Sequence, residues 1–193
     1  MKRFFAAAAI AVAVSNAHAE ETVRICYNWE CRSETEVVMT RSELRPAARQ
    51  FIDVHDAESE REAIRRAIAV LAATAARVSP IANDLPGNTL DYGVDGRMDC
   101  IDHSRTTHEY LRLFERRRWL RFHRVLEPAV RAPLLVNVHW AALIEERETE
   151  GKFVVDTWFH PNGAPAEIFE LDAWKRGASP ATQAVKPPAA GES

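Results

Sequence analysis

The chain has 193 residues, 25 of them basic and 28 acidic, and a formal net charge of -3. A chain of this length can build one domain around a single hydrophobic core. The slight acidic excess argues against nucleic acid as a partner, because nucleic-acid-binding domains carry a basic surface.

The first 19 residues have the features of a secretory signal peptide. Lys2 and Arg3 precede an apolar run over residues 4–14, and the sequence A-H-A at residues 17–19 supplies a small-residue cleavage site. The apolar run is shorter than the roughly 20 residues of a permanent membrane-spanning helix. We therefore expect a periplasmic or secreted mature chain that starts near Glu20 and has no stable membrane insertion.

The three cysteines are Cys26, Cys31 and Cys100. In an oxidising compartment exposed thiols tend to pair, and one of three must be left over. Cys26 lies near the end of one strand-like stretch, residues 22–27, and Cys31 lies before the next, residues 35–40. This arrangement predicts a hairpin whose turn is closed by a disulfide. Cys100 is then a free thiol, which in isolation is equally consistent with a small buried apolar residue.

Residues 57–78 have apolar side chains at helical spacing after Asp56, a good capping residue, and predict a long amphipathic helix. Residues 80–96 are rich in Pro, Gly, Asn and Asp and predict an extended loop that leads to Cys100. A loop of this length inside a domain is often functional.

Cys100 is expected in the first turn of a helix, because Asp99 suits the N-cap and Asp102 suits the acidic position of a capping box. The positive end of a helix dipole favours a thiolate, whereas the nearby Asp102 disfavours one, so a histidine partner is needed. The helix face of Cys100 also contains Ser104, Thr107, Leu111 and Phe114, which should face the rest of the fold. The basic run at residues 116–118 then complements the dipole at the helix end.

His139 lies in a β-rich stretch, residues 134–144, and Asp156 lies in the next one, residues 152–159. A polar turn near Glu148 separates them and predicts an antiparallel hairpin. In that register His139 and Asp156 are direct or diagonal cross-strand neighbours, about 5 to 8 Å apart at their β-carbons. Cysteine, histidine and aspartate are the parts needed for covalent acyl transfer.

These motifs resemble the papain-like, and more narrowly the transglutaminase-like, cysteine enzymes. The matching elements are C-I-D-H at residues 100–103, V-H-W-A at residues 138–141 and V-V-D-T-W at residues 154–158, within a region that covers residues 96–159. The family often has a glycine close before the cysteine, and here the nearest is Gly96. The resemblance implies an α+β fold with a papain-like or transglutaminase-like core, in which the nucleophile at a helix N-terminus packs on an antiparallel sheet.

The resemblance also implies a mechanism in which the Cys100 thiolate attacks an amide carbonyl of a peptide or protein substrate. His139 shuttles the proton, Asp156 holds the imidazole, and water or an amine resolves a thioester. Hydrolysis by an exported peptidase or isopeptidase is the favoured outcome. The alternatives are a transamidase that cross-links proteins and a non-catalytic exported domain of the same fold that binds a peptide or cell-wall component. Tryptophans suited to such recognition occur at positions 29, 119, 140, 158 and 174.

An oxyanion hole can take one donor from the Cys100 N–H. Asn83, Asn88 and Tyr92 in the preceding loop are candidates for the second donor, although each is also a common turn residue.

No cofactor or metal is expected. His103 and His108 are five residues apart, which does not place them on one helical face, and the chain has neither an H-E-x-x-H nor a C-x-x-C motif. The alternation around His123 predicts a strand residue instead of a ligand. The expected organisation is a single domain over residues 20–177, followed by a disordered Pro- and Ala-rich tail over residues 178–193.

Overall fold

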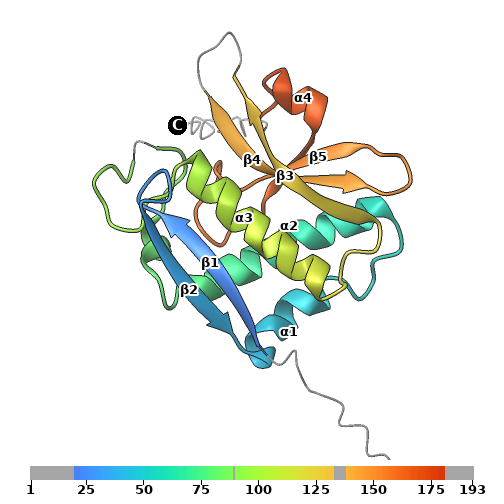
Figure 1. Cartoon of the computed structure of the whole chain (residues 1–193), viewed down its shortest axis with the longest axis horizontal. Helices are drawn as coiled ribbons and strands as arrows, with labels where there is room; N and C mark the ends of the chain where they lie inside the picture. Colours follow the sequence, from blue (N-terminus) through green and yellow to red (C-terminus); the bar gives the residue numbers. More distant parts are fainter. Residues whose placement is uncertain (1–19, 89, 133–137, 181–193) are drawn as a thin grey trace, which may run out of the picture.

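The computed structural model describes residues 20–88, 90–132 and 138–180, so the predicted signal peptide and residues 181–193 of the predicted tail lie outside it. The architecture is α+β with antiparallel sheets. Helix α3 (Cys100–Arg116) occupies the centre (Figure 1). It packs against a two-stranded sheet on one side and against a four-stranded sheet on the other.

The predicted N-terminal hairpin is confirmed as β1 (Glu21–Tyr27) paired with β2 (Ser33–Met39). Its inner face buries Val23, Ile25 and Met39 in the main core. The predicted disulfide between Cys26 and Cys31 is also present. Cys26 fixes the hairpin to α3, because its N–H donates to the Thr106 hydroxyl at 3.0 Å.

Three helical segments connect the hairpin to α3. These are α1 (Arg41–Arg49), α2 (Ala57–Ala75) and a short 3-10 helix, η1 (Pro80–Asn83), which lies within the predicted extended loop. The predicted cap of α2 is confirmed, since the Asp56 carboxylate accepts the N–H of Ser59 at 2.7 Å. Helix α1 was not predicted from the sequence, although Thr40 and Glu43 form a capping box at its start.

The second sheet has the strand order β3 (His123–Arg131), β4 (His139–Glu146), β5 (Lys152–Asp156) and β6 (Glu167–Glu170). One face packs into the main core through Ala142, Ile144 and Val155. The other face forms a smaller core with Trp174 of the C-terminal helix α4 (Leu171–Lys175). The sheet therefore separates two apolar layers.

The two strands predicted to bear site residues begin or end differently from expectation. The strand predicted over residues 152–159 ends at Asp156, because the Asp156 side chain accepts the Trp158 N–H at 3.2 Å and turns the chain. The strand predicted over residues 134–144 is described only from Val138, and its strand geometry starts at His139. Residues 133–137 lie outside the described part.

Within the described ranges, no helix combines the length and apolar character that crossing a membrane requires. The basic run after α3 contributes to packing: Arg116 and Arg117 form ion pairs with Glu21 of β1 at 3.2 and 2.8 Å.

Candidate active site

Cys100 is the first residue of α3 and the one cysteine outside the disulfide. The predicted capping box is confirmed: Asp99 Oδ1 accepts the N–H of Asp102 at 2.9 Å, and Asp102 Oδ2 accepts the N–H of Asp99 at 3.2 Å. The N–H of Cys100 donates to no acceptor in the described part of the chain. A half-buried thiol and a free N–H thus lie at the positive end of the helix dipole.

His139 and Asp156 are in direct contact across the β4–β5 hairpin. The register pairs Ala142 with Val155, which makes His139 and Asp156 diagonal neighbours, as predicted. His139 Nε2 donates to Asp156 Oδ2 at 2.7 Å. Because a carboxylate can only accept, Nε2 carries this hydrogen, and Nδ1 is the nitrogen left for the thiol.

Cys100 lies close to His139, at the N-terminal end of α3. Its Sγ lies 4.0 Å from the carbonyl oxygen of Val138, the residue directly before His139. Burial lowers the pKa of His139, but hydrogen bonds to Asp156 and Cys100 and the negative charges of both groups raise that pKa to about 9. The structure therefore brings all three predicted site residues together, with the imidazole between the thiol and the carboxylate.

An aromatic enclosure surrounds the imidazole. The ring centroids of Trp158, Phe159 and Trp174 lie 4.9, 5.9 and 5.8 Å from that of His139. The indole Nε1 of Trp174 also donates to Asp156 Oδ2 at 3.3 Å. Asp156 is thus fully buried yet has partners on both oxygens, which keeps its carboxylate fixed against the imidazole.

Arg131 and Trp174 support this carboxylate, a role that no sequence pattern predicted. The Arg131 guanidinium lies 4.7 Å from the centroid of the Trp174 ring and donates to the Trp174 carbonyl at 2.6 Å. A second bond, to the Ala178 carbonyl at 3.0 Å, places the start of the predicted tail against the fold. The one signal available from the chain was the tryptophan itself, which was considered above only for recognition.

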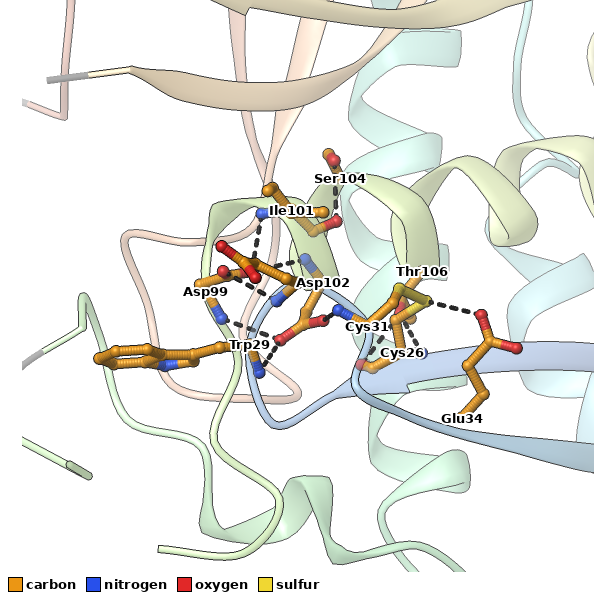
Figure 2. The surroundings of a disulfide bond; sticks show 10 residues. Cys26, Trp29, Cys31, Glu34, Asp99, Ile101, Asp102, Ser104 and Thr106 are labelled. Carbon is orange, nitrogen blue, oxygen red and sulfur yellow. Dashed lines mark hydrogen bonds between the residues drawn. A yellow bond between two sulfur atoms is a disulfide. The ribbon is translucent and has the colours of Figure 1, made fainter. Parts of the chain in front are cut away.

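The turn between β1 and β2 lies against the N-terminus of α3, and its backbone is left-handed. Asn28, Trp29, Glu30 and Cys31 all have φ between 53 and 68°. Each such residue costs about 1 kcal/mol or more without compensation. Compensation comes from Asp102, whose carboxylate accepts the N–H groups of Trp29 and Cys31, each at 2.7 Å (Figure 2).

Asp102 therefore has two roles, since it completes the helix cap and holds the turn. Burial and the charge of Asp99 raise the pKa of Asp102, whereas the N–H donors lower it, and the result is about 6. The Glu30 N–H donates to Asp99 Oδ2 at 3.0 Å, so both capping acids bind this turn. The disulfide closes the turn at Cys31, next to the helix that presents Cys100.

His103, one turn after Cys100 on α3, connects this helix to Asp84 and Thr157 in two other segments of the chain. Its Nε2 lies 3.2 Å from Asp84 Oδ2, and its Nδ1 lies 2.9 Å from the Thr157 hydroxyl. Burial lowers the pKa of His103, but Asp84 and more distant acids outweigh this and raise it. His103 is thus a buried partner of Asp84, and its other ring nitrogen contacts Thr157, the residue directly after Asp156.

The three candidates for a second oxyanion donor have different surroundings. Asn83 donates to the Asp95 carbonyl at 3.0 Å, and Tyr92 is 76% exposed, with its ring against Trp29. Asn88 is the candidate beside the enclosure, because its Oδ1 accepts the Trp158 indole N–H at 2.6 Å. This bond orients the amide so that its nitrogen, a donor, points elsewhere.

Two further histidines have acidic partners. His123 is a strand residue, as predicted, and its Nδ1 lies 2.8 Å from Glu60; His160 lies 2.7 Å from Glu167. Among the described residues, one group of three possible ligands is close enough to hold a metal ion, namely Cys26, Cys31 and Glu34. Its two sulfur atoms are bonded to each other, which removes them as thiolate ligands.

Comparison of the chain with protein-family models, with curated proteins and with solved structures gave no match. We therefore infer the possible chemistry of the site from the side chains that form it. A thiol at a helix start, an imidazole with a raised pKa and a buried carboxylate can together support attack on a carbonyl carbon and protonation of its leaving group.

Proposed function

We propose that this chain is an exported thiol-dependent amide hydrolase, a peptidase or isopeptidase with a transglutaminase-like or papain-like core. The observation that carries the proposal is the contact of His139 with both the Cys100 thiol and the Asp156 carboxylate. Further support comes from the free N–H of Cys100, which suits an oxyanion donor. The Cys26–Cys31 disulfide agrees with an oxidising compartment.

In the proposed reaction, the Cys100 thiolate attacks the amide carbonyl carbon, and the carbonyl oxygen becomes an oxyanion near the Cys100 N–H. The C–N bond then breaks, and the amine leaves with a proton from the His139 imidazolium. The resulting thioester is attacked by a water molecule whose proton passes to the neutral imidazole. Breakage of the C–S bond releases the acid and restores the thiolate–imidazolium pair, while Asp156 holds the ring throughout.

The acyl-enzyme provides the test. The mature protein is incubated with a peptide p-nitrophenyl ester, quenched in acid and analysed by mass spectrometry with peptide mapping. We expect an acyl adduct on Cys100 that hydroxylamine removes and that His139→Ala forms at least about 100-fold more slowly, as loss of a general acid–base group implies. Cys100→Ser is the matched control and should not form the thioester.

A folded wild-type protein that forms no adduct on Cys100 contradicts the proposal, and the non-catalytic binding domain then becomes the better account. Addition of a primary amine to the same reaction separates the two enzymatic outcomes. Free acid as the product supports hydrolysis, and an amide of the added amine identifies a transamidase.

A further inference from the structure

A cavity of about 440 Å³ lies between α3, the β1–β2 hairpin and the β3–β4 strands. Its lining includes Ile101 and Trp140, which directly follow Cys100 and His139 in the chain. It extends along α3 to Glu109, about 12 Å further at the rise of a helix. We call this space the α3–β3 cavity. Its volume lies within the range of small-molecule binding sites.

The walls of the α3–β3 cavity combine an apolar surface with charges of both signs. Ile101, Pro128 and Trp140 provide the apolar part. The cationic side chains are Arg24 of β1 and Arg105 of α3; the anionic ones are Glu34, Glu109 and Glu127. A ligand in this space therefore meets hydrocarbon and aromatic groups together with both kinds of charge.

Most of these charges have no partner in the protein. Among the described residues, the side chains of Arg24, Arg105, Glu109 and Glu127 take part in no hydrogen bond or ion pair. Arg105 and Glu109 are four residues apart on α3, a spacing at which opposite charges commonly pair.

Several charged groups elsewhere in the fold do pair. Arg61 binds Glu146 at 3.0 Å, and Arg65 and Arg66 each bind Glu62 at 2.9 Å, in the latter case across the same four-residue spacing. The unpaired groups of both signs in the α3–β3 cavity are thus available to a ligand. A guanidinium is well suited to a carboxylate, and a carboxylate to an ammonium group.

We propose that the α3–β3 cavity binds the part of an amide substrate that carries both a free carboxylate and a free ammonium group, as a zwitterionic peptide end or amino-acid branch does. The carboxylate binds Arg24 and Arg105, the ammonium group binds Glu109 and Glu127, and the carbon chain packs on Trp140. A ligand with one charge would leave groups of the other sign unused. The word substrate rests on the proposed function, whereas the binding preference does not.

The test measures binding to the Cys100→Ser protein by isothermal titration calorimetry, so that no chemistry is required. The probes are alanyl-alanine, its N-acetyl form and its C-terminal amide. We expect each cap to weaken binding at least about tenfold, which corresponds to 1.4 kcal/mol. Equal binding of the three probes, or binding of none, overturns the proposal.

Single substitutions test which side chain binds the carboxylate of the ligand and which binds its ammonium group. In Arg105→Gln the acid and its amide should bind alike, while the penalty for N-acetylation persists. In Glu109→Gln the free dipeptide and its N-acetyl form should bind alike, while the penalty for the C-terminal amide persists. Arg45→Gln, which alters an exposed arginine on α1, is the control and should bind all three probes as the parent does.

The binding test and the test of Cys100 reactivity can fail independently of each other. Charge-dependent dipeptide binding with an unreactive Cys100 supports the cavity and contradicts the hydrolase. A reactive Cys100 with no charge-dependent binding supports the hydrolase and overturns the inference about the cavity.

Discussion

At the scale of single residues, the proton on His139 determines when the proposed site can work. The ring is held between the Cys100 thiol and the Asp156 carboxylate, and its pKa is raised from 6.5 to about 9. At neutral pH the imidazole is therefore protonated and can donate to a leaving amine. The same proton should be lost as the pH rises through about 9.

The pH dependence of kcat/KM checks this assignment. We expect the wild-type value to fall as the pH rises through about 9, because the imidazolium deprotonates. Asp156→Asn removes a neighbouring negative charge, so the pKa of His139 should drop and this falling limb should move to lower pH by about 1 unit or more. A limb at the same pH in both proteins would show that another group controls it.

The proximity of His139 and Asp156 could be predicted from the sequence, because only a short turn separates their strands. His139 and Asp156 lie on adjacent strands of one hairpin, so the turn length alone placed them side by side. Trp174 and Arg131 could not be found in this way, because their contacts with the site depend on how the C-terminal segment packs across the sheet. Neither the alternation nor the capping pattern of a sequence contains that information.

At the scale of elements, the start of α3 depends on the left-handed turn of the neighbouring hairpin. The loop before α3 is also bound to that turn, since the Gly96 N–H donates to the Asn28 side chain at 3.0 Å and the Asn28 N–H donates to the Arg97 carbonyl at 2.7 Å. The hairpin, the loop and the helix cap thus form one hydrogen-bonded unit around the nucleophile. Caps and strands were predictable from local sequence, but four left-handed residues in a row were not, because distant carboxylates stabilise them.

Gly96 and Gly93 provide a matched pair for testing this unit. Both have positive φ, but a β-carbon at Gly96 would lie 2.0 Å from the Pro80 carbonyl oxygen, whereas one at Gly93 meets nothing within 4 Å. Gly93→Ala should cost about 1 kcal/mol, the conformational penalty alone. Gly96→Ala should cost at least about 3 kcal/mol in urea unfolding, because backbone must also move. Equal costs would contradict the packing described for the loop.

Asp102→Asn tests the link between the turn and the cap. An amide keeps one acceptor oxygen, so at least one of the bonds to Trp29, Cys31 and Asp99 should be lost. We expect a loss of about 1 to 3 kcal/mol in the free energy of unfolding. Acylation of Cys100 should slow as well, while Asn88→Ala, which removes the acceptor of the Trp158 indole N–H, leaves the turn unchanged. Full retention of stability would show that the carboxylate is not what holds the turn.

At the scale of the whole molecule, the site lies where segments distant in the sequence meet, and buried polar groups join those segments. Glu60 of α2 is fully buried and accepts the N–H groups of Arg121, Phe122 and His123. These bonds fix α2 to the chain that enters β3 and the second sheet. The sequence predicted both elements, but not their connection, because Glu60 reads as an ordinary exposed acid in the first turn of a helix.

The predicted consequence is a large difference between two acids on the same helix. Glu60→Gln should lower the free energy of unfolding by at least about 2 kcal/mol, because a buried backbone donor loses its acceptor. Glu62→Gln removes only surface ion pairs with Arg65 and Arg66 and should change it by about 1 kcal/mol or less. Urea unfolding at neutral pH measures both, and similar small losses would contradict the proposed role of Glu60.

The central claim is that Cys100 acts as a nucleophile because His139 contacts it. The rate of alkylation of Cys100 by iodoacetamide, followed by mass spectrometry, tests this most directly. We expect the wild-type thiol at neutral pH to react about tenfold faster than free cysteine or more, and His139→Ala to lose this advantage. A thiol that reacts no faster than free cysteine, or one that is indifferent to the loss of the imidazole, would contradict the account.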